Sequence, residues 1–311
     1  MREGLIEKVA EAAAPKERPD GSRYRSLSFA DQRRLADSQG SDHKAVQLAA
    51  LQQGIVPEVY ARNQKRLSSE DQIKLLQSHV AVIGLGGLGG TVTEILARIG
   101  IGSLTLVDGD SFDDSNLNRQ LLSSTEVLGE QKATVAAKRV KAVNPAVKTQ
   151  AVSSFLTAEN AETLLSGATI AVDCLDSITD RFTLEAACRT MAITMVSAAI
   201  GGTSGQLTVI YPGDKGLSRI YGPPEKASHR GVEKSLGTLP FAAITLAAME
   251  CAEVVAMAVG DPSGLKNRLL ITDLIDHSPV SYTHLTLPTR SCQCRSRWGG
   301  GQGRRGGGGG G

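Results

Sequence analysis

The chain has 311 residues, of which 41% are hydrophobic and 21% charged, a composition that favours one large soluble α/β domain with a smaller appendage. Its net charge of +2 comes from the tail, because residues 280–311 contain five arginines and no acidic residue, which leaves about −3 on residues 1–279. This distribution excludes a general basic surface for nucleic acid, and we expect no nucleic-acid partner.

The N-terminal segment, residues 1–56, is polar and helix-prone, with a turn signal at Pro19-Asp20-Gly21. It predicts a helical N-terminal appendage of one or two helices. No signal-peptide pattern is visible at the start of the sequence, and no C-x-x-C pair occurs among the five cysteines. We therefore expect a cytoplasmic protein with reduced cysteines, without a disulfide framework or a zinc site.

The main domain, residues 57–279, alternates strand-like and helix-like segments. Strands are predicted at residues 79–84, 103–110, 148–152, 169–174, 194–197, 205–214 and 267–275. Helices are predicted at residues 70–76, 87–100, 132–143 and 240–259. This βαβα rhythm predicts a doubly wound, Rossmann-like, mainly parallel α/β sheet. The longest apolar stretch, Leu236–Gly260, is interrupted by a proline and two glutamates, which indicates a core helix and no membrane span.

The tail, residues 280–311, differs from everything before it. It holds ten of the 34 glycines and the only tryptophan, and it shows no periodicity. Such a composition cannot bury enough apolar surface to order a chain. The stretch SYTHLTLPT is similar to a translated sequencing adapter. We interpret the tail as disordered and non-native, and a native disordered Arg-Gly tail is the alternative.

A glycine-rich loop follows the strand at residues 79–84 and opens the next helix. Its glycines are Gly84, Gly86, Gly87 and Gly89. Glycine lets the backbone approach a phosphate, and a helix N-terminus offers free N–H donors and a positive dipole. Asp108 ends the next strand, where an acidic residue binds a ribose in this layout. The pattern predicts a nucleotide site, without separating NAD from ATP; a glycine turn used only for close packing is the alternative.

The residues after Asp108 favour a highly charged ligand. Asp110 is followed by the block SNLNRQ, which contains Asn116 and Arg119, and then by Lys132. Two cations beside an amide suit a triphosphate better than the pyrophosphate of NAD. Taken singly, Arg119 is more typical of a surface ion pair, and Lys132 of a solvated lysine at a helix start.

Five sequence blocks occur in a characteristic order and spacing: VAVIGLGGLGG, LVDGDSFDDSNLNRQLL, LGEQKA, VNPAV and DCLDS. They resemble the ThiF/MoeB/HesA family, the bacterial relatives of the ubiquitin-activating enzymes, over about residues 60–274. The resemblance implies a homodimeric adenylyltransferase. Such an enzyme uses ATP and Mg²⁺ to activate the C-terminal glycine carboxylate of a small sulfur-carrier or ubiquitin-like protein ending in Gly-Gly, and it releases pyrophosphate. That carboxylate is ionised at pH 7, so the reaction needs cations and no general base.

The resemblance also implies a role for each matching residue. Gly87 would contact the nucleotide, and Asp108 would bind the ribose hydroxyls. Asn116, Arg119 and Lys132 would surround the phosphates. The expected nucleotide-binding set is Gly84, Gly86, Gly87, Gly89, Asp108, Asp110, Asn116, Arg119, Lys132 and Asp176.

Two further roles come from the DCLDS block and from a segment before the glycine loop. Asp176 would associate with Mg²⁺, and Arg62 would reach the ATP phosphates of the opposite subunit. Arg62 lies in a stretch that resembles the family's R-Y-x-R-Q pattern, in which Val59 here replaces the first arginine and Asn63 the glutamine. The expected catalytic residues are Arg119, Lys132, Asp176 and Arg62.

The sequence also departs from the family pattern. Most members carry two C-x-x-C pairs for zinc, but residues 217–222 read LSRIYG, so we expect no zinc. Many members carry a thiol-bearing cysteine before the last long helix, where this chain reads SHRGVEKSLG, with Gly231 near that position. An NAD(P)-binding oxidoreductase and a nucleotide-binding scaffold without turnover stay open as alternatives. SNLNRQ with Lys132, and the lack of an evident catalytic His, Lys or Tyr group, speak against the oxidoreductase.

Overall fold

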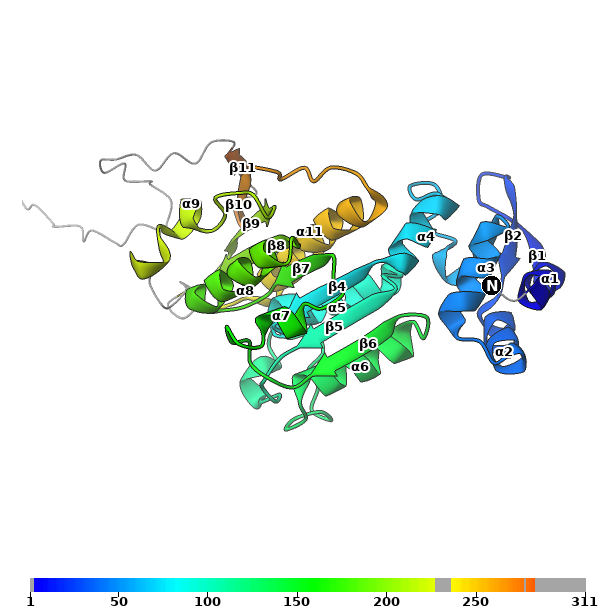
Figure 1. The fold of residues 1–311 in the computed structure, drawn as a ribbon, viewed down its shortest axis with the longest axis horizontal. Helices are drawn as coiled ribbons and strands as arrows, with labels where there is room; N and C mark the ends of the chain where they lie inside the picture. Colours follow the sequence, from blue (N-terminus) through cyan, green and yellow to red (C-terminus); the bar gives the residue numbers. More distant parts are fainter. Residues whose placement is uncertain (1–2, 227–235, 277, 283–311) are drawn as a thin grey trace, which may run out of the picture.

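The computed structural model describes residues 3–226, 236–276 and 278–282, which form a small N-terminal unit and a larger α/β domain (Figure 1). The larger domain is built on an eight-stranded sheet of order β11-β10-β9-β8-β7-β4-β5-β6. The parallel strands are β4 (His79–Ile83), β5 (Ser103–Val107), β6 (Lys148–Val152), β7 (Ile170–Asp173) and β8 (Thr194–Gly201). The antiparallel strands are β9 (Ser204–Ile210), β10 (Leu269–Asp273) and β11 (Ser278–Tyr282).

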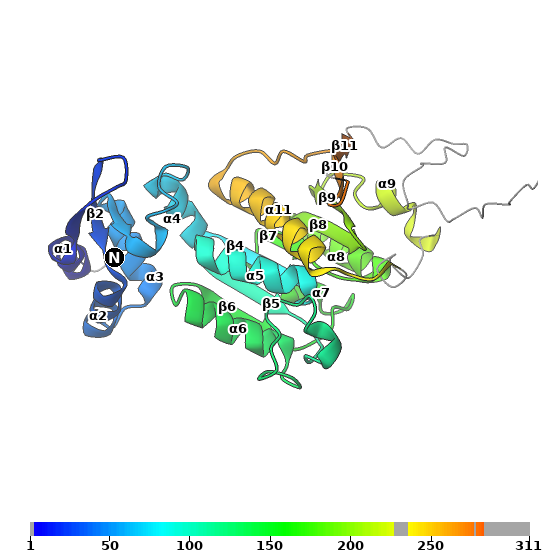
Figure 2. The same cartoon turned by 180° about the vertical axis from the view of Figure 1, so that it is seen from behind.

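Helices cover both faces of this sheet. Figure 2 shows α5 (Gly87–Ile99), α6 (Lys132–Val143) and α11 (Pro240–Val259) over one face, while α7 (Ala161–Leu164) and α8 (Ile178–Thr190) lie over the other (Figure 1). Alternate residues of β4 point to opposite faces of the sheet. Val80 and Val82 pack with α5 on one face, whereas Ala81 and Ile83 pack with α7 and α8 on the other. The predicted doubly wound, mainly parallel fold is confirmed.

The N-terminal unit contains more than the predicted helices. Its helices are α1 (Glu3–Ala12), α2 (Phe29–Gln39) and α3 (His43–Gln52), and its strands are β1 (Ala14–Glu17), β2 (Arg23–Leu27) and β3 (Ile55–Pro57). The strands form a separate sheet of order β1-β2-β3. The sequence analysis missed this sheet and one helix, because β1 is a four-residue strand with every residue exposed and shows no apolar alternation.

The predicted start of the tail at residue 280 is also wrong. Residues 278–282 form β11, which pairs antiparallel with β10, for example Ile271 with Val280. Its pairing satisfies backbone groups that β10 would otherwise expose as an edge strand. The prediction for residues 283–311 lies outside the described residues.

Helix α11 is, among the described residues, the single helix long and apolar enough to cross a membrane by length and composition alone. In the fold it packs against α5, β8 and β9, with Ala243, Leu246 and Val254 in the main hydrophobic core. The predicted core helix is thus confirmed.

A buried chain of hydrogen bonds joins the N-terminal unit to the sheet domain. The Tyr60 hydroxyl donates to Oε1 of Gln47 on α3 (2.9 Å) and accepts from Nδ2 of Asn144 at the end of α6 (2.8 Å). Asn144 also donates to the carbonyl of Ala97 on α5 (3.0 Å), and Gln47 donates to Gln32 on α2 (3.0 Å). The N-terminal unit therefore docks at the amino ends of the strands, where Lys44 donates to the Gly102 carbonyl. It leaves the carboxyl ends of the same strands uncovered.

We predict that Tyr60→Phe lowers the free energy of unfolding by about 1–3 kcal/mol, because Gln47 Oε1 then loses its donor inside the protein. Urea denaturation measures the change. Tyr24→Phe is the control, since Tyr24 makes only a longer, part-buried bond to Glu58 (3.3 Å) and should stay within about 0.5 kcal/mol of wild type. Equal stability of Tyr60→Phe and Tyr24→Phe would show that this link contributes nothing.

Candidate functional site

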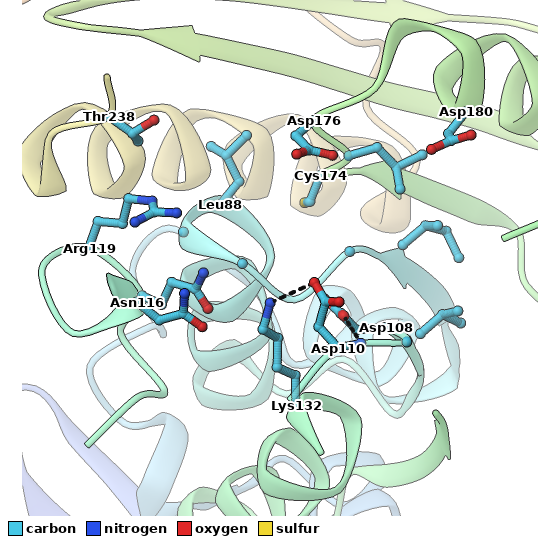
Figure 3. Close-up of a pocket in the computed structure, with 18 of the residues that line it drawn as sticks. Leu88, Asp108, Asp110, Asn116, Arg119, Lys132, Cys174, Asp176, Asp180 and Thr238 are labelled. Carbon is cyan, nitrogen blue, oxygen red and sulfur yellow. Dashed lines mark hydrogen bonds and ion pairs between the residues drawn. The ribbon is translucent and has the colours of Figure 1, made fainter. Parts of the chain in front are cut away.

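A cavity of about 710 Å³ lies at the carboxyl ends of the parallel strands (Figure 3). The chain adds β5 and β6 on one side of β4, and β7 and β8 on the other, so the topological switch lies between β4 and β7. Loops diverge at such a point and leave a crevice for a ligand. The loops after β4, β5 and β7 all line this cavity.

The glycine loop forms one wall, and its glycines have two different functions. Gly84 has a φ of +90°, and a side chain there would lie 2.7 Å from the Cys174 carbonyl oxygen; one at Gly89 would lie 1.8 Å from the Gly84 oxygen. These two glycines allow the loop to fold. Gly86 and Gly87 line the cavity, and α5 begins at Gly87 without a side-chain cap. The first N–H groups of α5 are therefore suited to an anion.

Asp108 anchors the loop after β5 to the glycine loop. Its Oδ2 accepts from the Leu85 N–H (2.7 Å), and its Oδ1 accepts from the Asp110 N–H (2.8 Å). Burial raises the pKa of the Asp108 carboxyl above its ordinary value, and these two N–H donors with Lys132 counteract the rise. Each carboxylate oxygen keeps a lone pair for a hydroxyl ligand.

Lys132 is the buried cation of the site. Its side chain is 7% exposed, and its Nζ lies 3.1 Å from Oδ2 of Asp110, as the dashed line in Figure 3 marks. Lys132 is also the first residue of α6, and its backbone N–H donates to the Asp110 carbonyl (3.0 Å). An anionic ligand that displaced Asp110 would meet a desolvated charge, which acts more strongly than an exposed one.

The SNLNRQ block supplies the remaining polar wall. Asn116 is buried and donates to Oδ1 of Asp113 (3.0 Å), while Arg119 donates to the Ser115 carbonyl (2.9 Å) and to Asn118 (2.9 Å). In Figure 3 both Asn116 and Arg119 lie on the same side of the cavity as Lys132. Asp176, in the turn after β7, lines the cavity on the opposite side.

The structure therefore brings ten of the predicted site residues to one region and leaves Arg62 out. Gly84, Gly86, Gly87, Asp108, Asp110, Asn116, Arg119, Lys132 and Asp176 line the cavity, and Gly89 supports the glycine loop. Arg62 lines a separate, mostly apolar groove of about 540 Å³ between α5 and α11. No group of three or more His, Cys, Asp or Glu side chains that could hold a metal occurs within the described residues.

The sequence analysis missed several lining residues. Gln120 is buried in the same SNLNRQ block, and its Oε1 has no hydrogen-bond partner, so the motif itself contained the signal. Phe155 is 65% exposed and lies against Gly109, where a side chain would come within 2.7 Å of its ring. Thr238 reaches the site from the start of α11, and its carbonyl accepts from Asn118 (3.4 Å). No local pattern marks the last two.

Comparison with known proteins finds relatives in sequence and in fold. The sequence model of the ThiF family matches residues 60–296. The vegetative protein HesA of Trichormus variabilis is 34% identical over 206 residues, which cover 66% of this chain and 76% of that protein. The sulfur carrier protein ThiS adenylyltransferase of Escherichia coli is 32% identical over 201 residues, covering 64% and 80%. The crystal structure of E. coli MccB with ATP has the same fold, with a TM-score of 0.62, 22% identity and coverage of 72% and 71%.

We predict that Asp108→Asn destabilises the ligand-free protein by about 1–3 kcal/mol, because an amide NH₂ then faces a backbone N–H that needs an acceptor. Asp114→Asn is the control, since Asp114 is an exposed carboxylate in the same loop after β5. Urea denaturation of both variants should give the larger loss for Asp108→Asn. If Asp108→Asn is as stable as wild type, its two backbone bonds do not hold the glycine loop.

Proposed function

Because this chain belongs to the ThiF family and is an adenylyltransferase, we propose that it adenylates the C-terminal glycine carboxylate of a small sulfur-carrier or ubiquitin-like protein. In this reaction a carboxylate oxygen attacks the α-phosphorus of ATP, the bond from the α-phosphorus to the bridging oxygen breaks, and pyrophosphate leaves. The ThiS adenylyltransferase relative supports a sulfur carrier as the partner class.

The observation that carries the proposal is the polarity of the cavity. Asn116, Arg119 and Lys132 supply polar and cationic side chains, and the lining also includes the apolar residues Phe155 and Leu156, of which Phe155 lies against Gly109. Asp108 lies between the glycine loop and the loop after β5. A nucleoside triphosphate matches this lining, with the base on the apolar residues, the ribose hydroxyls on Asp108 and the phosphates on the cations.

The attack joins two anions, so the residues around the phosphates offset charge and take no proton. Lys132 and Arg119 stabilise the phosphate oxygens that gain charge as pyrophosphate leaves. The N–H groups at the start of α5 add their dipole. These roles favour an adenylyltransferase over an NAD(P)-linked oxidoreductase, because the cations of the site suit the phosphate chain of a triphosphate.

Asp176 fits a magnesium site of the kind that enzymes form with bound nucleotides. Mg²⁺ typically takes one or two protein carboxylates and completes its shell with phosphate oxygens and water. Asp176 provides one such carboxylate facing the cavity. When bound, Mg²⁺ would neutralise phosphate charge and orient the triphosphate.

The product proposed for this chain is the acyl adenylate, without a thioester on any cysteine of the described residues. Burial raises the pKa of the thiols of Cys174, Cys188 and Cys251, that of Cys188 to about 12. None of these thiols is therefore ionised at neutral pH, and a thiolate is the form that attacks an adenylate. Residues 227–235, which include Gly231, lie outside the described part of the chain.

We predict that Arg119→Ala and Lys132→Ala each slow carrier-dependent exchange of pyrophosphate into ATP by at least ~100-fold. The assay uses labelled pyrophosphate and ThiS as the probe carrier. Lys138→Ala is a matched control on the same helix, because Lys138 is exposed and pairs with Glu130, and it should exchange normally. Normal pyrophosphate exchange in both site variants would show that the site lies elsewhere. If the wild type shows no exchange, the result favours a nucleotide-binding scaffold without turnover.

The second part of the proposal is a homodimer in which Arg62 acts across the interface. Arg62 is exposed and lines a groove away from its own cavity, so it does not reach that cavity's phosphates within one chain. A triphosphate carries about four negative charges, against which Arg119 and Lys132 supply two positive charges and Mg²⁺ two more, while Asp108 and Asp176 bring negative charge back. An arginine from a partner subunit would offset part of the remaining negative charge.

We predict that mixing Arg62→Ala chains with Lys132→Ala chains restores about a quarter of the sites, since random exchange makes half the dimers mixed, each with one intact site. Pyrophosphate exchange before and after mixing measures the recovery. Mixing Arg119→Ala with Lys132→Ala is the control and should restore none, because both residues serve the same site. If mixed dimers form and stay inactive in the first mixture, Arg62 does not act in trans.

A further inference from the structure

Arg181, on α8, is among the largest fully buried side chains of the protein and lies directly beneath the turn that carries Asp176. Its Nη1 donates to Oδ2 of Asp173 at the end of β7 (2.9 Å) and to the carbonyl of Ala198 on β8 (2.6 Å). Its Nη2 donates to the carbonyl of Leu175 in the turn itself. One guanidinium thus joins two strands and the turn.

The turn is also held from Asp173, the ionic partner of Arg181, and from β4, where the Ile83 carbonyl accepts from the Cys174 N–H (2.9 Å). Oδ1 of Asp173 accepts from the Leu175 N–H (3.1 Å), and Oδ2 accepts from the Ser197 hydroxyl (2.6 Å). Both polar groups of the Leu175 backbone are therefore held by Asp173 and Arg181. Leu175 immediately precedes Asp176, so these bonds fix the backbone next to the residue whose carboxylate faces the cavity.

Arg181 lies in a buried cluster with two carboxyl groups, Asp173 and Glu250, and forms an ion pair with Asp173 (2.9 Å). Glu250, on α11, is fully buried near Asp173, and its burial together with that neighbouring carboxylate raises the pKa of Glu250 well above its ordinary value. Burial also raises the pKa of Asp173, and the Arg181 guanidinium lowers it, so Arg181 favours the charged form of its ion-pair partner. A buried pair contributes little net stability, which makes a role in holding geometry the better account of its presence.

We propose that Arg181 is a positioning residue, which holds the turn at residues 173–176 so that Asp176 faces the phosphates and their magnesium ion. This inference rests on the proposed nucleotide site. It assigns Arg181 a role through the turn, which Arg181 holds by donating to Asp173, Leu175 and Ala198. Residues that orient a metal ligand from behind typically change metal affinity by about 10–100-fold when replaced.

The test is calorimetric titration of the full chain with ATP, with and without Mg²⁺ and without any carrier. The readout is the Mg²⁺-linked gain in ATP affinity. Arg181→Lys keeps the charge beside Asp173 but cannot bridge Leu175 and Ala198 with a planar fork, and it should reduce this gain by at least ~10-fold while leaving Mg²⁺-free affinity unchanged. Ser197→Ala removes one bond to Asp173 and spares the Leu175 link, so it should keep the gain.

Asp176→Asn separates the two hypotheses. Suppose that Asp176→Asn loses the Mg²⁺-linked gain in ATP affinity while folded Arg181→Lys keeps it in full. That result overturns the role of Arg181 and leaves the proposed site intact. A full gain in Asp176→Asn removes the magnesium assignment and, with it, the positioning role. If circular dichroism shows that Arg181→Lys does not fold, the charge-neutral pair Asp173→Asn with Arg181→Gln takes its place, with the same expected loss and the same contrary result.

Discussion

The close approach of two loops at the switch between β4 and β7 is the constraint from which the rest of the site follows. The Cys174 carbonyl occupies the space that a side chain at Gly84 would need, so the glycine loop and the turn after β7 pack backbone against backbone. That contact brings the start of α5 and the turn after β7 into the walls of one cavity. A larger residue at Gly84 would separate the walls and with them the cations from Asp176.

The cavity also depends on how its charges are held in place. Lys132 is paired with Asp110, and Arg181 with Asp173, so the described site contains two ion pairs that differ in exposure. The first pair has an exposed carboxylate, which an anionic ligand can replace at low cost. The second is buried on both sides, and separating it would leave an uncompensated charge in the core. The first pair is thus suited to exchange partners during binding, and the second to keep the frame rigid.

The N-terminal unit contributes from the opposite end of the sheet. Its hydrogen bonds through Tyr60 and Asn144 end on the carbonyl of Ala97, in the last turn of α5. The first turn of the same helix lines the cavity. Helix α5 is therefore held at both ends, by the glycine loop at its start and by the N-terminal unit at its end, which gives residues 3–57 a structural connection to the site without a place in it.

Local sequence patterns were sufficient for the parallel sheet, the glycine loop, Asp108 and the two cations, because consecutive β-α units place such residues at one sheet edge whatever the details of packing. They were insufficient wherever a contact joins distant segments. The short exposed strand β1 and the edge strand β11 exist through pairing with their neighbours. Asn118 donates to the carbonyl of Thr238, 120 residues away in the sequence. Arg181 on α8 donates to the carbonyl of Ala198 on β8. Such contacts arise from the close packing of the folded chain, so only the tertiary structure decided them.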